Sequence, residues 1–231
     1  MTPFDAVVEP IAFVPQAVLF DMDGLMIESE RALLQCWREA AQELALPLGD
    51  ELWLSMIGLH DRACHEMLRA LLDETQVQAL LSRCHALYDE HVRAGLPLKS
   101  GVLELLALLD ARGIPRAVAT STRRERALQK LELCGLLPHF HAVVTGSDVA
   151  HPKPAPDIYL LAARELGVDP ARCVVLEDSV PGVQAALAAG MTPIQVPDLV
   201  VPGDDVRALG HRIVESLLQA RRLIEPVLGG R

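Results

Sequence analysis

The stretch Ala17–Gly24 reads Ala-Val-Leu-Phe-Asp-Met-Asp-Gly and ends an apolar run with two carboxylates. The four apolar residues are typical of a buried strand, and the glycine lets the backbone turn sharply after it. Two acids held this close repel each other unless a cation or a shared proton offsets their charge. A divalent metal ion is one such cation, and beside it one carboxylate can attack phosphorus while the other transfers a proton. The string Asp-x-Asp-Gly alone also fits a plain surface turn, so the rest of the chain has to decide.

The composition indicates a globular protein that is not built to bind polyanions. The chain has 231 residues, of which 51% are hydrophobic, enough for one large domain or one domain with an insert. Its formal net charge of −10 argues against nucleic acid or an anionic membrane as a partner. No apolar run has membrane-spanning length, and the first thirty residues hold no Lys or Arg that would mark a signal peptide. The five cysteines form no Cys-x-x-Cys pair. We therefore expect a cytoplasmic protein with reduced, buried thiols.

The second half of the chain alternates between short apolar strands and helices. Expected strands cover residues 117–119, 142–145, 173–176 and 193–196, and expected helices lie between them, at about 123–133, 157–166 and 183–189. This alternation predicts an α/β fold with a Rossmann-like parallel sheet and helices on both of its faces. The strand at 17–20 belongs to the same sheet.

The segment between residues 28 and 99 has a different pattern. Its apolar residues repeat at helical spacing, as at Leu33, Trp37 and Leu44, and no strand is evident. The sequence thus predicts an α/β core of residues 1–28 and 99–231 with a small α-helical cap, residues 29–98, inserted into it. Such a cap would lie over the carboxyl ends of the strands, where open α/β sheets bind ligands.

Hydroxyl groups follow the second expected strand, at Thr120 and Ser121. A hydroxyl and free backbone N–H groups at a strand-to-helix junction suit a phosphate group. The same residues also suit the N-cap of the helix expected from about residue 123. The two roles use one geometry and can hold together.

A single lysine and a second acidic strand end complete the candidate set. Lys153 stands between two prolines, and it is one of only three lysines in the chain. An ammonium fixed there can neutralise both Asp21 and a phosphate, although a solvated turn is the alternative. Glu177 and Asp178 follow the strand at 173–176 and could supply a further magnesium ligand, although Asp178 or Ser179 would also cap the next helix. The acidic pair at 204–205 follows no strand and is expected in a solvated loop.

Four motifs in this order resemble the haloacid dehalogenase-like superfamily, in the branch with a helical cap after the first motif. The resemblance runs from about residue 16 to residue 200. The strings Phe20–Glu30, Lys153–Asp157, Leu176–Gly182 and Ala185–Met191 carry it. One departure is Glu28, where relatives usually have Asp.

The resemblance implies a role for each motif. Asp21 would be the nucleophile that forms an aspartyl-phosphate, and Asp23 would protonate the leaving oxygen and then activate water. The Thr120 hydroxyl and the Ser121 backbone would hold the phosphate, which Lys153 would neutralise. The implied cofactor is Mg²⁺. Its ligands would be Asp21, the Asp23 carbonyl and Asp178, with Glu177 either a ligand or a support behind the ligands.

Within the superfamily the sequence favours a phosphatase. A phosphonate hydrolase would need a cap lysine, and none lies between Gly24 and Leu98. A dehalogenase lacks the second acid of the first motif, which is Asp23 here. We expect a magnesium-dependent phosphatase of a small phosphorylated metabolite, either a sugar phosphate or a nucleoside monophosphate. A β-phosphoglucomutase-like phosphosugar mutase is the alternative, and a non-catalytic relative that binds a partner through its cap is a third.

Substrate choice is expected to lie in the cap, in the segment Gly58–Arg62. This segment interrupts the helical pattern and resembles the cap loop that reaches the active site in relatives. Arg62 would meet a phosphate or a sugar, and His60 would bond to a hydroxyl, whereas the alternative for both is a solvent-facing loop. A cap of this size leaves the site accessible in a monomer, which is the expected state.

Overall fold

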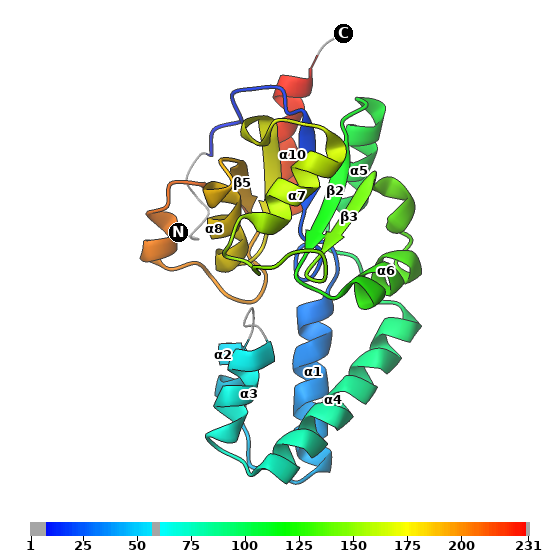
Figure 1. Ribbon diagram of the computed structural model, residues 1–231, viewed down its shortest axis with the longest axis vertical. Coiled ribbons are helices and arrows are strands. Elements are labelled where there is room, and N and C mark those ends of the chain that lie inside the picture. The colour runs from blue at the N-terminus through cyan, green and yellow to red at the C-terminus, as the bar shows by residue number, and fades with distance from the viewer. Residues whose placement is uncertain (1–7, 57–60, 230–231) are drawn as a thin grey trace.

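The computed structural model describes residues 8–56 and 61–229, without the side chains of Asp61 and Arg62. Figure 1 shows a sheet covered by helices in the upper part of the molecule and a group of helices in the lower part. The two parts correspond to the two sequence patterns, strand-helix alternation and helical spacing alone.

The upper part is built on a six-stranded parallel sheet with the order β3-β2-β1-β4-β5-β6. The strands are β1 (Ala17–Phe20), β2 (Arg116–Thr120), β3 (Ala142–Thr145), β4 (Cys173–Glu177), β5 (Thr192–Gln195) and β6 (Arg212–Ile213). The sheet confirms the predicted fold class. Strand β6 was not expected, because two residues, one of them charged, form no apolar run.

Helices cover both faces of the sheet, and the side chains of β1 alternate between them. Val18 and Phe20 belong to one buried cluster, with residues of α5 (Val102–Ala111), α6 (Arg124–Leu133) and α10 (Leu217–Ile224). Ala17 and Leu19 belong to the other, with α7 (Asp157–Leu166) and α8 (Val180–Ala188). Short 3₁₀ helices lie at η1 (Leu137–His139), η2 (Pro170–Arg172) and η3 (Glu225–Leu228). A strand buried on both faces explains why all four of its residues are apolar.

The acidic pair Asp204 and Asp205 corrects one expectation. The two residues do not lie in a loop but open a short helix, α9 (Asp204–Arg207), with Gly203 as its N-cap. Carboxylates in a first helical turn are stabilised by the exposed N–H groups and the helix dipole. A pair of acids after Pro-Gly is therefore as much a helix start as a solvated turn.

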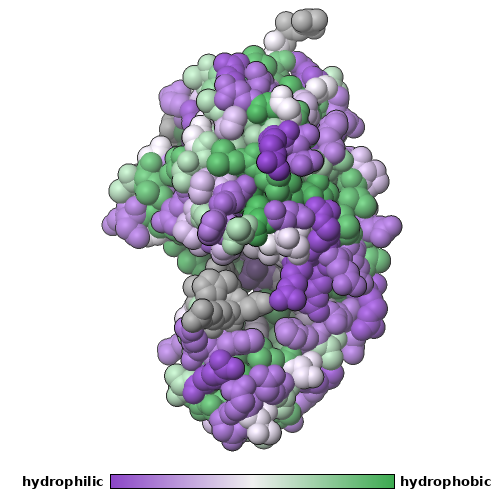
Figure 2. Space-filling view, in the orientation of Figure 1, coloured by the Kyte–Doolittle hydropathy of each residue, from purple (hydrophilic) through white to green (hydrophobic). Residues whose placement is uncertain are grey.

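The lower part consists of α1 (Ser29–Glu43), α2 (Asp50–Met56), α3 (Asp61–Arg69) and α4 (Glu74–Ala94). Helix α1 packs along α4, and Trp37 of α1 stacks on Trp53 of α2 with ring centroids 5.5 Å apart. On the face shown in Figure 2, hydrophilic residues predominate over this part of the molecule. We refer to α1–α4 as the cap; its predicted limits, residues 29 and 98, stay a prediction. No helix in the described ranges is long and apolar enough to cross a membrane.

The two chain segments that join the parts run side by side. Ile27 and Leu98 form an antiparallel bridge, and the Glu28 N–H donates to the Pro97 carbonyl at 2.9 Å. Beside them the Lys99 ammonium lies 2.6 Å from Oδ1 of Asp198, a residue of the loop between β5 and α9. The cap thus leaves and rejoins the core at one place, directly after the Ala17–Gly24 stretch.

Candidate active site

The strand order determines where the polar strand ends meet. In the order 3-2-1-4-5-6 the chain connections diverge between β1 and β4, and such a switch point opens a crevice at the carboxyl ends of the strands. Phe20 of β1 pairs with Leu176 of β4, so the next residues along, Asp21 and Glu177, are neighbours. The Asp21 N–H also donates to the Leu176 carbonyl at 3.0 Å. The two acidic strand ends seen in the sequence therefore face one site.

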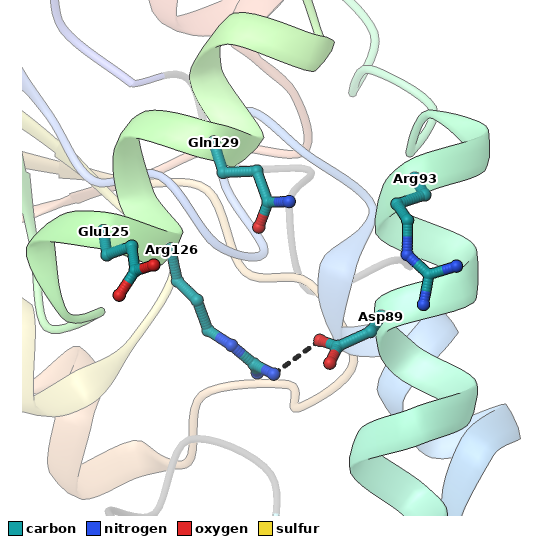
Figure 3. A pocket seen from close by; sticks show the side chains of 5 residues that line it. All are labelled: Asp89, Arg93, Glu125, Arg126 and Gln129. Atoms are coloured by element: carbon teal, nitrogen blue, oxygen red, sulfur yellow. Dashed lines mark hydrogen bonds and ion pairs between the residues drawn. The ribbon is translucent and has the colours of Figure 1, made fainter.

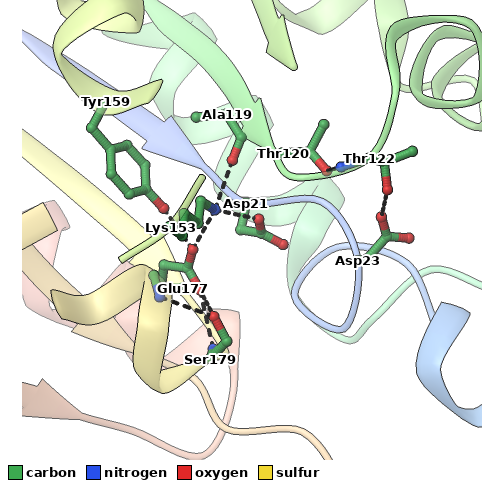
Figure 4. A network of polar contacts seen from close by, with 10 residues as sticks. Asp21, Asp23, Ala119, Thr120, Thr122, Lys153, Tyr159, Glu177 and Ser179 are labelled. Atoms are coloured by element: carbon green, nitrogen blue, oxygen red, sulfur yellow. Dashed lines mark hydrogen bonds and ion pairs between the residues drawn. The ribbon is translucent and has the colours of Figure 1, made fainter. Parts of the chain in front are cut away.

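Lys153 joins these two carboxylates. Its Nζ lies 2.6 Å from Asp21 Oδ1, 2.6 Å from Glu177 Oε1 and 2.9 Å from the carbonyl of Ala119. Figure 4 shows the ammonium between the three oxygens, and the side chain is 5% exposed. The lysine is thus a buried cation with three acceptors rather than a solvated residue of a proline turn.

Both oxygens of Glu177 are occupied by protein donors. Oε1 accepts from Lys153 and from the Tyr159 hydroxyl, at 2.6 Å each, and Oε2 accepts from the N–H and the hydroxyl of Ser179 at 3.1 and 2.9 Å. The side chain is fully buried (Figure 4). Gly182 is required next to it, since a Cβ there would lie 1.8 Å from Oε1. Of the two roles considered for Glu177, this setting favours support of Lys153 over direct metal binding.

Asp23 has its own cation. Lys130 of α6 places Nζ 2.6 Å from Asp23 Oδ1, and the Thr122 hydroxyl donates to Oδ2 at 2.7 Å. The Asp23 side chain is 18% exposed and that of Lys130 is 6% exposed. The second carboxylate of the motif is therefore held separately from the first.

The electrostatic balance differs between the carboxylates. Burial raises the pKa of Asp21 to about 7, helped by the charge of Glu177 and opposed by Lys153. The pKa of Asp178 is raised well above its usual range by burial and by the charges of Asp21 and Glu177. Burial also acts to raise the pKa of Asp23, but the charge of Lys130 and the hydrogen bonds from Lys130, Thr122 and Ser29 together outweigh it and lower the pKa of that carboxyl. The group around Asp21 thus carries more negative charge than Lys153 alone neutralises.

Asp178 lies against the turn that follows β1. Gly24 has φ +78°, and a Cβ on it would lie 2.4 Å from Asp178 Oδ2. The Asp178 carbonyl accepts a hydrogen bond from Gln195 Nε2 at 3.0 Å. The glycine of the motif therefore serves two purposes, the left-handed turn and the approach of the second acidic strand end.

These residues fit a magnesium ion in chemistry and in charge. Asp21 and Asp178 offer carboxylate oxygens, the donor type that Mg²⁺ prefers. Burial, and after it the repulsion of neighbouring carboxylates, raises their pKa values, and a divalent cation would offset both effects. Within residues 8–56 and 61–229, no group of three or more His, Cys, Asp or Glu side chains is arranged to hold a metal ion. Mg²⁺ commonly binds through one or two carboxylates and completes its shell with waters and substrate phosphate, so a two-carboxylate site agrees with both findings.

The hydroxyl residues after β2 do not cap the next helix. Helix α6 begins at Arg124, and its N-cap, Arg123, makes no side-chain cap bond. Thr120 is buried, and its hydroxyl instead accepts from the N–H of Thr122 at 3.1 Å. The capping interpretation is therefore wrong here. Ser121 is exposed at the same strand end, where a phosphate could reach its N–H.

The other expected cap is present. The Ser179 hydroxyl accepts from the Gly182 N–H at 3.2 Å and so begins α8, while Asp178 is left free of that role. The two cap residues His60 and Arg62 lie outside the described residues, because neither side chain is described. Their assignment to the substrate stays a prediction.

Three residues of the site were not assigned from the sequence: Lys130, Thr122 and Tyr159. Two features of the sequence could have identified Lys130. Lysine is rare in this chain, and Lys130 lies on the same helix face as the apolar residues Ala127 and Leu131, which are buried. Thr122 stood in the hydroxyl run after β2. Tyr159 lies in the first turn of α7, and no local pattern distinguishes it from an ordinary core aromatic.

An α/β sheet with a carboxylate nucleophile candidate at its switch point defines a hydrolase-like class of enzyme. A sequence profile described as haloacid dehalogenase-like hydrolase matches residues 15–190. The phosphorylated carbohydrates phosphatase of Thermotoga maritima is 33% identical over 180 residues, covering 78% of this chain and 83% of the relative. The fructose-1-phosphate phosphatase YqaB of Escherichia coli K12 is 34% identical over 184 residues, covering 78% and 95%. A crystal structure described as a putative β-phosphoglucomutase from Thermotoga maritima superposes with a TM-score of 0.78 at 29% identity, covering 91% and 99%.

The chain belongs to the haloacid dehalogenase-like hydrolase family. It is an enzyme of the phosphomonoester hydrolase type within that family. The resemblance seen in the four motifs is thereby confirmed.

Proposed function

We propose that the protein is a magnesium-dependent phosphatase that hydrolyses a small phosphorylated metabolite through an aspartyl-phosphate on Asp21. The observation that carries the proposal is the separation of the two motif carboxylates, each with its own lysine. A pair that shared one proton would perform one task, whereas two separately held carboxylates can divide nucleophile and proton transfer between them. The relatives named as carbohydrate and fructose-1-phosphate phosphatases support a sugar phosphate as the substrate. A nucleoside monophosphate is the other small metabolite the site would take.

In the first step a carboxylate oxygen of Asp21 attacks phosphorus and the bond between phosphorus and the ester oxygen breaks. Asp23 is ionised in the free protein because its pKa is lowered, and it would take up a proton once the negatively charged phosphate ester lies beside it. It then gives this proton to the departing oxygen, so the product leaves as a neutral alcohol. Lys153 stays beside Asp21 and offsets charge on the transferred phosphoryl group. The Thr120 hydroxyl and the Ser121 N–H, after β2, would donate hydrogen bonds to the remaining phosphoryl oxygens.

In the second step water attacks the phosphorus of the aspartyl-phosphate. Asp23, now a carboxylate, takes a proton from this water, and the bond between Asp21 and phosphorus breaks to release inorganic phosphate. Lys130 and Thr122 hold both Asp23 oxygens in the structure, which suits a carboxylate that has to accept a proton from a defined direction. Asp23 ends the cycle protonated, ready for the next ester.

Magnesium would be held by Asp21, the Asp23 carbonyl and Asp178, and it would supply positive charge that lowers the pKa of Asp21 and binds the phosphate. Glu177 would support the site through Lys153, as its hydrogen bonds indicate. In the cap, His60 and Arg62 stay our candidates for recognising the part of the substrate beyond its phosphate. We propose a monomer as the working unit, because all described members of the site come from one chain.

The test measures phosphate release from a panel of sugar phosphates and nucleoside monophosphates, with Mg²⁺ and with EDTA. We expect magnesium-dependent release from at least one substrate class and its loss in Asp21→Asn. Trapping the wild-type enzyme with substrate and measuring its mass should show one added phosphoryl group, which is absent in the variant. Isomerised sugar phosphate without release would instead establish a mutase. No turnover of any panel member would contradict the enzyme proposal and favour a binding role for the cap.

A further inference from the structure

Lys130 is a buried cation whose position the proposed reaction does not by itself explain. It lies in the middle of α6, on the helix face that Ala127 and Leu131 bury against the core. A lysine on such a face loses hydration and needs a strong partner to stay charged. Burial alone would lower its pKa, but the charges and hydrogen bonds of Asp23 and Tyr88 together outweigh burial and raise it, so Lys130 is an ammonium in this structure.

Its ammonium contacts two parts of the molecule at once. On one side Nζ lies 2.6 Å from Asp23 Oδ1, at the end of the motif after β1. On the other side Nζ lies 5.0 Å from the ring centroid of Tyr88, a buried residue of cap helix α4. An ammonium over an aromatic face at this distance is attracted by the ring. Lys130 therefore connects the carboxylate of the core to the cap.

The surrounding contacts show that α6 and α4 face each other along this line. One helical turn before Lys130, Arg126 forms an ion pair with Asp89 of α4. Figure 3 shows this pair across a groove of about 270 Å³, with Glu125 and Gln129 on the α6 side and Arg93 on the α4 side. The lining of that groove is polar and open to solvent, whereas the Lys130–Tyr88 contact is buried.

We propose that Lys130 is a positioning residue for Asp23, and that its contact with Tyr88 makes this positioning depend on the cap lying against α6. The proposal rests on the proposed function, because it assigns Lys130 to the proton-transfer carboxylate of that reaction. Lys130 does not touch the reacting atoms and acts only through Asp23.

The geometry explains how one lysine fixes the carboxylate. Thr122 donates to Oδ2 and Lys130 donates to Oδ1, so the two donors together determine the plane of the Asp23 carboxyl group. Without Lys130 the group can turn about its last side-chain bond while keeping the Thr122 bond. Proton transfer is sensitive to such a turn, because donor and acceptor must come within hydrogen-bond distance along a defined direction.

The experiment compares two substrates that differ in their need for an acid. A sugar phosphate releases a poor leaving group that needs a proton from Asp23, whereas 4-nitrophenyl phosphate releases a stable anion that does not. The value of kcat/KM reports steps up to departure of the leaving group and therefore isolates the acid role from the later water attack. In Lys130→Met we expect kcat/KM for the sugar phosphate to fall about 10- to 100-fold, a fraction of the range that general acid catalysis supplies. For 4-nitrophenyl phosphate we expect a fall of less than about 3-fold.

The ratio of the two kcat/KM values, taken on one sample, does not depend on how much of the variant is folded. A purely structural role would lower both values by the same factor and leave the ratio at its wild-type value, which would overturn the proposal. Lys130→Arg keeps a cation that can reach both Asp23 and the Tyr88 ring, and it should restore most of the ratio. Arg124→Gln is the matched control, because it removes a cation of the same helix whose partner is Asp148 rather than Asp23 or Tyr88. Its ratio should equal that of the wild type.

The link to the cap is tested at Tyr88. Tyr88→Phe keeps the aromatic face but removes the hydroxyl that also interacts with Lys130, so it should shift the substrate ratio by less than Tyr88→Leu. Tyr88→Leu removes the face and should shift the ratio in the same direction as Lys130→Met, by a smaller factor. An unchanged ratio in Tyr88→Leu would overturn the cap dependence. Absence of phosphatase activity in the wild type would instead overturn the proposed function, so the two failures are distinguishable.

Discussion

Asp178 lies so close to Gly24 that a Cβ on the glycine would be 2.4 Å from its Oδ2. This contact brings the acidic end of β4 against the turn that follows β1, where the charge of Asp21 acts on Asp178. Gly24 also has φ +78°, a conformation that side chains disfavour. The motif glycine therefore serves the approach of Asp178, a ligand of the proposed metal site, as well as the turn.

We predict that Gly24→Ala abolishes most magnesium-dependent activity and lowers the free energy of unfolding by more than backbone strain alone. Gly167→Ala is the matched control, since Gly167 has φ +67° and open space around its Cα. The control should cost about 1 kcal/mol from the left-handed backbone and leave activity unchanged. Urea unfolding and phosphate release measure the two effects. Equal stability losses in both variants would contradict the role of the Asp178 contact.

The sequence was sufficient for the part of the site that follows from strand order. Asp21, Thr120, Lys153 and Glu177 stand at or beyond the ends of apolar runs, and parallel strands bring their carboxyl ends to one edge. The hydrophobic pattern and the turn residues therefore predict that these four residues lie at the same edge of the sheet.

The rest depended on packing that a single sequence does not show. Lys130 reaches Asp23 from the middle of a helix 107 positions further along the chain, and only the tilt of α6 against the sheet brings them together. One of the hydrogen bonds to Glu177 comes from the hydroxyl of Tyr159 in α7. The sequence pattern does not distinguish Tyr159 from an ordinary core residue. Strand β6 was not predicted, because a strand of two residues is too short to show a hydrophobic periodicity.

We predict that Asp178→Asn stabilises the metal-free protein at neutral pH while it removes the response to Mg²⁺. The folded pKa of Asp178 is raised above its usual 3.8, so its ionisation disfavours the folded state. Below about pH 4 the group is protonated in both states and the substitution has no such effect. As pH rises above that value, the unfolded chain ionises first and the wild type loses stability relative to the variant.

Thermal melting of both proteins in EDTA from pH 4 to pH 8 measures this difference. The variant's advantage in Tm should grow with pH, and Mg²⁺ should remove it by stabilising only the wild type. A variant that melts below the wild type in EDTA at pH 8 would show that Asp178 is not a site of repulsion.

We predict that Tyr159→Phe destabilises the fold and weakens the support of Lys153 without removing activity. Its hydroxyl donates to Glu177 Oε1 at 2.6 Å in a buried setting, and hydrogen bonds to charged groups contribute about 1.5–3 kcal/mol. The loss should appear in urea unfolding. Because Lys153 keeps both of its carboxylate partners, kcat should fall by less than about 10-fold, a change that corresponds to about 1.4 kcal/mol. Inactivation of a well-folded Tyr159→Phe would assign the hydroxyl a direct part in the reaction.

We predict that Lys99 and Asp198 are coupled where the cap rejoins the core. The Asp198 side chain is 2% exposed and lies 2.6 Å from the Lys99 ammonium, which also approaches Glu28 at 3.5 Å. Breaking a buried pair from one side leaves a buried charge and commonly costs about 3–5 kcal/mol. Arg31 lies 3.6 Å from the same Asp198 oxygen and would still offset part of its charge. We therefore expect Lys99→Met to lower the free energy of unfolding, measured in urea, by about 2–4 kcal/mol.

The double variant Lys99→Met with Asp198→Asn should recover much of that stability, because the unpaired charge is then gone. The difference between the double variant and the sum of the single variants gives the coupling energy directly. If the two substitutions are additive within about 0.5 kcal/mol, the pair does not hold the junction between cap and core. In that case the backbone bonds between Glu28 and Pro97 and between Lys99 and Met26 would be its main connection.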